Sequence, residues 1–143
     1  MIRIEIPGEP VAQGRPRFAR RGKYVSTYDP PKSQAYKQQV AIYARASMTS
    51  REPFTGPLEV AMYIYRRIQQ SGSQRLKQAK LDGKIWPVIK PDLDNYYKAI
   101  TDACTGIVWR DDNQIVKAHI IKKYSDQPRA VLEVEELGEE QEK

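Results

Sequence analysis

The sequence PDLDNYYKAITDACTG at residues 91–106 sets the fold of the second half of the chain. Its apolar side chains recur every three to four residues and predict a helix with one buried face. These positions are Tyr96 or Tyr97, Ile100, Cys104 and Ile107. Because aspartate is a preferred capping residue and a proline precedes it, Asp92 and Asp94 are expected around the helix N-terminus. Gly106 suits the helix end.

The opposite face of this helix is polar and begins a cluster of charges. Its expected members are Asp94, Lys98, Thr101, Asp102 and Thr105. Lys98 lies one turn after Asp94 on the same side. A second acidic pair, Asp111-Asp112, follows the helix. Carboxylates repel phosphates unless a divalent cation lies between them, so carboxylates in a basic chain predict a magnesium-dependent enzyme acting on nucleic-acid phosphodiesters.

Each part of this cluster also has a structural explanation. Asp92 and Asp94 can be explained as ordinary helix caps, and Asp111-Asp112 can be explained as a turn that precedes a strand. Lys98 is suitably spaced for a surface ion pair with Asp94. Only the joint pattern favours a catalytic site over these alternatives.

Outward from this stretch, periodicity predicts one domain with four strands and two main helices. Alternating apolar residues predict strands at 1–6, 58–65, 115–123 and 129–135, and a helical stripe covers 32–48. A short helix is expected near 73–81, inside a basic connector at 66–90. The fold class is therefore α/β (α+β), with a domain at 1–135. Residues 136–143 are expected to form an acidic, partly disordered tail.

The charge of the chain indicates a polyanionic partner. The net charge is +6, but residues 133–143 hold six glutamates and one lysine, so residues 1–132 carry +11. Such a basic body favours nucleic acid, although solubility alone is an alternative. The segment from Pro7 to Pro31 is long and rich in Gly, Pro and Arg. It is expected to contact nucleic acid, and the alternative is a flexible surface hairpin.

Several classes of protein are disfavoured by composition. The one cysteine, Cys104, is expected in the core and rules out an internal disulfide framework. His119 is expected to be a packed or surface residue, and there is no Gly-rich phosphate loop or paired cysteine for zinc. No apolar run is long enough to span a membrane and no signal peptide is recognisable, so a soluble, cytoplasmic protein is expected.

At this point the motifs resemble those of a known family. Residues 90–99, KPDLDNYYKA, followed by residues 109–116, WRDDNQIV, resemble the RusA family of Holliday-junction resolvases, which prophages often carry. GRPR at residues 14–17 and YDP at residues 28–30 are similar to a branch with a longer N-terminal loop. The resemblance extends from Ile2 to about Val134.

The resemblance implies a mixed sheet and a homodimer that cuts four-way DNA junctions with magnesium, for which manganese substitutes. It places the metal-binding catalytic aspartates at Asp92, Asp94 and Asp112 and the catalytic lysine at Lys98. Asn95 matches the motif asparagine, and Asp111 matches a secondary acidic position.

One departure from the family concerns DNA binding. The arginine run that often precedes the first aspartate is absent, and Lys90-Pro91 stands in its place. The basic residues expected to bind DNA are Arg15, Arg17, Arg20, Arg21, Lys23 and Lys90. Two alternative functions stay open: a non-catalytic basic DNA-binding protein, and a metal nuclease for flaps or other branched DNA.

Overall fold

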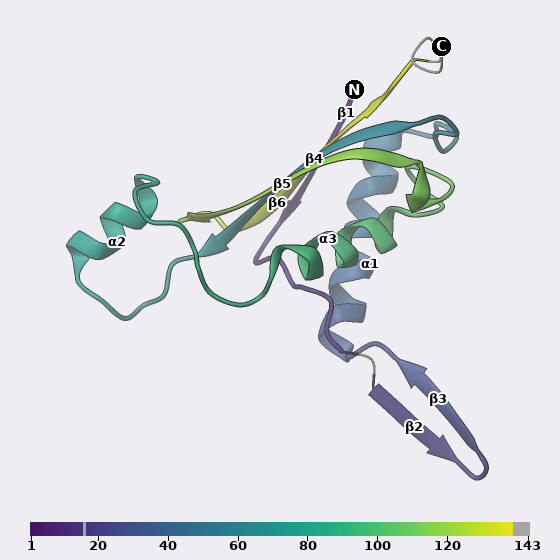
Figure 1. The fold of residues 1–143 in the computed structure, drawn as a ribbon, viewed down its shortest axis with the longest axis horizontal. Helices are drawn as coiled ribbons and strands as arrows, with labels where there is room; N and C mark the ends of the chain where they lie inside the picture. Colours follow the sequence, from purple (N-terminus) through teal and green to yellow (C-terminus); the bar gives the residue numbers. More distant parts are fainter. Residues whose placement is uncertain (16, 139–143) are drawn as a thin grey trace.

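The structure is a computed structural model that describes residues 1–15 and 17–138 (Figure 1). Its main sheet has four strands in the order β1-β6-β4-β5, with β4 and β5 parallel and the other pairs antiparallel. The strands are β1 (Ile2–Pro7), β4 (Leu58–Arg67), β5 (Ile115–Ser125) and β6 (Arg129–Glu136). The prediction of a small α+β domain with a mixed four-stranded sheet is confirmed.

Two helices cover one face of this sheet (Figure 1). They are α1 (Pro31–Met48) and α3 (Leu93–Cys104), which pack against each other as well as against the sheet. The remaining elements are the short helix α2 (Gln74–Leu81), the hairpin of β2 (Arg17–Arg21) and β3 (Tyr24–Tyr28), and the 3-10 helix η1 (Asp112–Gln114). In Figure 1 the hairpin and α2 project from opposite ends of the molecule.

The core lies between the sheet and these two helices, as the strand alternation requires. Ile2, Ile4 and Ile6 of β1 are buried, while Arg3 and Glu5 between them are exposed. The same alternation puts every second residue of β4, from Leu58 to Ile64, into the core. Cys104 and Trp109 are fully buried, so both are packing residues, and burial raises the pKa of the Cys104 thiol to about 12.

Two expectations differ from the structure in local detail. Thr101 was expected on the polar face of α3, but it is buried, because its hydroxyl donates to the Tyr97 carbonyl at 2.8 Å within the helix. The Pro7–Pro31 segment is not a continuous loop but contains the β2–β3 hairpin, and its contact with nucleic acid stays a prediction. His119 is exposed on β5, 3.6 Å from Glu59, as a surface histidine.

The C-terminal strand continues into the predicted tail. β6 ends at Glu136, and the Leu137 amide still donates to the Pro57 carbonyl at 2.8 Å. Residues 139–143 of the tail lie outside the described residues. In the described part of the chain, no helix has the length and apolar character needed to cross a membrane.

Candidate functional site

The N-terminus of α3 presents two carboxylates to solvent. Asp92 is the N-cap residue by its extended backbone, but its side chain accepts no capping hydrogen bond. Asp94 lies in the first turn, where the helix dipole favours negative charge. The buried side of α3, formed by Tyr96, Ala99, Ile100 and Cys104, fixes the helix on the core and leaves Asp92 and Asp94 exposed. Both carboxylates are therefore free to bind a ligand.

Two cations on the sheet position the segment that leads into α3. The Lys122 ammonium of β5 donates to the carbonyls of Ile89 and Pro91, at 2.8 and 2.9 Å. The Arg66 guanidinium of β4 donates to the Lys90 carbonyl at 2.7 Å. Burial and the neighbouring Arg66 charge lower the pKa of Lys122, and the Asp92 carboxylate opposes that shift.

The role of Lys122 was not predicted from the sequence. The available signal was its register, because Lys122 alternates with Ile120 along β5 and is paired with the buried Ile64 of β4. A lysine on the core-facing register of a strand is unusual and requires polar partners. Here the partners are the carbonyls beside Asp92.

A hollow in front of α3 brings four of the predicted residues together. Its volume is about 360 Å3, and its lining consists of Arg15, Lys90, Pro91, Asp92 and Asn95. Two residues assigned to DNA binding and two assigned to the catalytic centre therefore share one cavity. Acidic and basic groups face the same space, which suits a phosphate accompanied by a cation.

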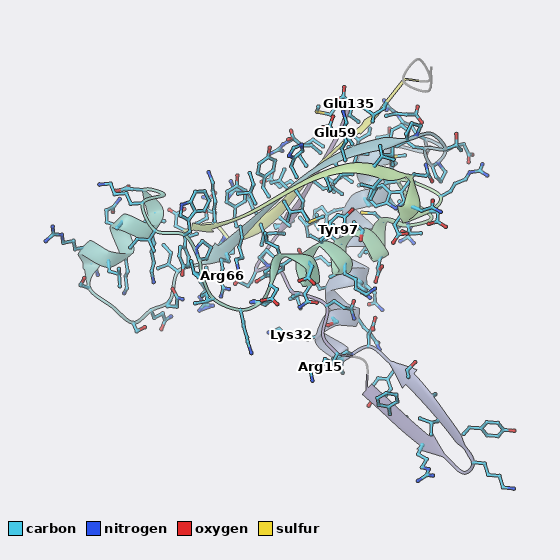
Figure 2. The ribbon with its side chains drawn as sticks, viewed as in Figure 1. Arg15, Lys32, Glu59, Arg66, Tyr97 and Glu135 are labelled. Atoms are coloured by element: carbon cyan, nitrogen blue, oxygen red, sulfur yellow. The ribbon has the colours of Figure 1, made fainter. Side chains whose placement is uncertain are left out.

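The segment that carries Arg15 is fixed at the edge of this hollow. The Gln13 amide donates to the Asn95 carbonyl at 2.9 Å, and the Gly14 amide donates to the Ser33 hydroxyl at 3.0 Å. A Cβ on Gly14 would lie 2.9 Å from the Pro30 ring, so only glycine permits this close approach. Figure 2 shows Arg15 where the chain leaves the body toward β2.

The second acidic pair divides into a structural and a free carboxylate. Asp111 caps η1, because its carboxylate accepts from the Asn113 amide at 3.0 Å. Gln114 completes the capping box by accepting from the Arg110 and Asp111 amides, each at 2.9 Å. Its amide nitrogen donates to the Phe54 and Gly56 carbonyls, at 2.9 and 3.0 Å. This use of Gln114 as a clamp was not foreseen from the sequence.

Asp112 follows the cap and its side chain is not used in η1. Burial, followed by the negative charge of Asp112, raises the pKa of the Tyr97 hydroxyl. The charge of Asp112 thus acts on Tyr97, which is one helical turn after Asp94. Asp112 is not among the residues that line the hollow with Asp92 and Asn95.

The donor chemistry of these residues fits a hard cation. Asp92, Asp94 and Asp112 are exposed, and the described hydrogen bonds and ion pairs leave their side-chain oxygens unengaged. Within the described residues, no group of three or more His, Cys, Asp or Glu side chains is arranged to hold a metal ion. Magnesium needs no such group, since it is commonly held by one or two carboxylates, substrate phosphates and water.

An ion-pair network joins α3 and α1 next to Lys98. The Lys37 ammonium of α1 lies 2.8 Å from the Asp29 carboxylate and 3.4 Å from the Asp102 carboxylate of α3. The hydrogen bond from Lys37 lowers the pKa of Asp29, and the nearby Lys98 charge lowers it further. The described ion pairs do not join Lys98 to Asp94, so the simple helix pair is not formed.

The predicted DNA-binding residues fall into two groups. Arg15 and Lys90 line the hollow, whereas Arg20 and Lys23 are exposed on the hairpin that projects from the body (Figure 1). The remaining two predictions concern Arg17 and Arg21, whose side chains lie outside the described part of the structure.

The fold and this surface define a small, basic α+β protein that presents carboxylates beside cations, as proteins acting on nucleic-acid phosphodiesters do. The family model described as Endodeoxyribonuclease RusA matches residues 7–135. The chain belongs to this family of endodeoxyribonucleases, the RusA Holliday-junction resolvases. It is also similar to a Bacillus subtilis (strain 168) protein described as Uncharacterized protein YqaN. The two are 37% identical over 139 residues, which cover 96% of this chain and 97% of that protein.

Proposed function

We propose that this chain resolves four-way DNA junctions by paired, metal-dependent cleavage of phosphodiester bonds. The observation that carries the proposal is the hollow in which Asp92 and Asn95 face Arg15 and Lys90. A basic surface alone would bind DNA, and an acidic one would repel it. The two together suit a surface where phosphate and a hard cation meet.

Magnesium is the proposed ion, with manganese as its substitute, and Asp92, Asp94 and Asp112 are its proposed ligands. The described residues do not hold these three carboxylates together as one group, so the proposal requires them to close around the ion when DNA binds. Such an ion lowers the pKa of bound water and neutralises the charge that develops on the phosphate. The aspartates supply hard oxygen ligands and are exposed enough to admit DNA. Asn95, at the hollow, is proposed to orient a ligand carboxylate through its side-chain amide.

Lys98 and Asp111 have different proposed roles near the ligands. Lys98 is exposed on the same side of α3 as Asp94, so its ammonium is proposed to stabilise negative charge on the reacting phosphate or to orient the attacking water. Asp111 caps η1 and is proposed to act on catalysis only by fixing Asp112. The expected product is a nick that leaves a 5′-phosphate.

A homodimer is the proposed active form. In the described part of the chain, the helices α1 and α3 cover one face of the sheet, and neither of them covers the other face, which carries Glu59, Tyr63 and His119. Two copies related by a two-fold axis would supply two sites and match the symmetry of a four-way junction. Paired nicks in opposing strands would then resolve the junction.

The test compares the cleavage of a four-way junction, a flap and a linear duplex of shared sequence, each with magnesium and with chelator. We expect magnesium-dependent cleavage with a strong preference for the junction and two symmetric cuts. Binding without any cleavage would favour the non-catalytic alternative. Preferred cutting of the flap would favour a different branched-DNA nuclease.

A further inference from the structure

The β2–β3 hairpin has apolar surface that nothing in the described chain covers. Tyr24 is 81% exposed, Phe18 72% and Val25 58%, and the two strands pair only with each other. An isolated two-stranded hairpin is marginally stable in water. Aromatic side chains that stay exposed at its end add nothing to the stability of the folded domain. These side chains are therefore available to a partner.

The hairpin nevertheless has a defined turn, and hydrogen bonds hold its base to the body of the protein. Arg21 pairs with Tyr24 across a two-residue turn, and Gly22 has φ +60° at its first position, as a type II′ turn requires. At its base, Asp29 accepts from Lys37 at 2.8 Å and from Gln13 at 3.0 Å. These bonds join the hairpin to α1 and to the segment that carries Arg15.

The charge of this segment identifies the partner as a polyanion. Residues 10–28 contain five arginine and lysine residues and no aspartate or glutamate. Phe18 shares one face of the ribbon with Arg20, and Tyr24 lies on the other face beside the turn residue Lys23. Exposed aromatic rings next to cations are typical of surfaces that stack on nucleic-acid bases.

We propose that Tyr24 and Phe18 stack on bases that are unstacked at the branch point of the junction. This inference rests on the proposed junction substrate and adds the element that distinguishes a junction from a duplex. Arg15, at the start of the segment, lines the hollow with Asp92, so a strand opened by the hairpin leads toward the carboxylates. Duplex DNA has no unstacked base to offer, and its binding depends on the cations alone.

The test measures binding in chelator, so that cleavage plays no part. The DNA is a four-way junction with 2-aminopurine at the branch point, compared with a linear duplex that carries the probe in the same sequence. The variants are Tyr24→Thr and Phe18→Thr, because threonine retains strand propensity without an aromatic ring. The matched control is Tyr43→Gln, which removes a partly exposed tyrosine from α1.

Wild type is expected to change the probe fluorescence at the branch point and to prefer the junction over the duplex. Each hairpin variant is expected to lose about tenfold in junction affinity and most of the fluorescence change, with duplex affinity within about twofold of wild type. Tyr43→Gln is expected to behave as wild type.

Three results would overturn the inference. Hairpin variants that keep the full junction preference would overturn it and leave the proposed function intact. A wild type without junction preference would overturn both. Variants that sediment as smaller species than wild type would instead assign the hairpin to a contact between copies of the chain.

Discussion

The side chain of Gln114 fixes the turn that carries Asp112. Its side chain accepts from the amides of Arg110 and Asp111 and donates to the carbonyls of Phe54 and Gly56. Gln114→Glu retains the two acceptor bonds but loses the two donor bonds. At about 1 kcal/mol for each, the loss is about 2 kcal/mol of unfolding free energy, or about 6 °C in Tm.

The pH dependence of this loss follows from the charge of the new side chain. A half-buried carboxylate facing two carbonyl oxygens would have its pKa raised above the ordinary glutamate value of about 4.3. Because the folded pKa is raised, the destabilisation is complete above that pKa. It diminishes as the pH falls toward the ordinary value, where the protonated acid donates again.

The assay is thermal melting of wild type and Gln114→Glu from neutral to acidic pH, with junction cleavage at neutral pH. Gln38→Glu on exposed α1 makes the same chemical change where no described hydrogen bond is lost. Cleavage by Gln114→Glu is expected to fall, by up to about a hundredfold for a displacement of Asp112 near 1 Å. If Gln114→Glu and Gln38→Glu melt alike at every pH, the clamp has no such role.

Three other predictions concern the charged groups around the site. Asp112→Asn is expected to abolish junction cleavage with binding retained. Asp111→Asn is expected to reduce cleavage only slightly, because an asparagine still caps η1. Equal cleavage rates for the two variants would contradict this assignment. Lys98→Ala is expected to slow single-turnover cleavage about a hundredfold with little change in Tm, and a lower Tm with normal cleavage would make Lys98 structural. Asp29→Asn is expected to lower the Tm at neutral pH. Since the folded pKa of Asp29 is depressed, this difference is expected to vanish as the pH falls through that pKa, and a deficit that persists in acid would refute the Lys37 pairing.

The sequence predicted the elements whose side chains alternate between core and solvent. β1, β4 and α3 follow their apolar periodicity, because burying one face is what stabilises each of them. The β2–β3 hairpin has no buried face, so periodicity gave only a loop or hairpin. Thr101 was misplaced because a hydroxyl that bonds within its own helix tolerates burial.

The site was predictable by residue type but not by its supporting contacts. Asp92, Asn95, Arg15 and Lys90 share one hollow, whereas Asp94 and Asp112 are not among its lining residues. The clamp of Lys122 on the segment before Asp92 depends on the pairing of distant strands, which spacing along the sequence does not specify.

The most direct test of the account uses Asp92, because the structure separates its two possible roles. Asp92 is the N-cap residue of α3 but makes no side-chain cap hydrogen bond, and asparagine caps helices as well as aspartate does. Asp92→Asn should therefore melt as wild type does. The measurement is single-turnover cleavage of a four-way junction in magnesium, with junction binding measured in parallel. We expect complete loss of cleavage, with junction binding equal to or tighter than that of wild type. Cleavage at the wild-type rate would contradict the proposed metal-binding role and show that Asp92 is only the N-cap residue of α3.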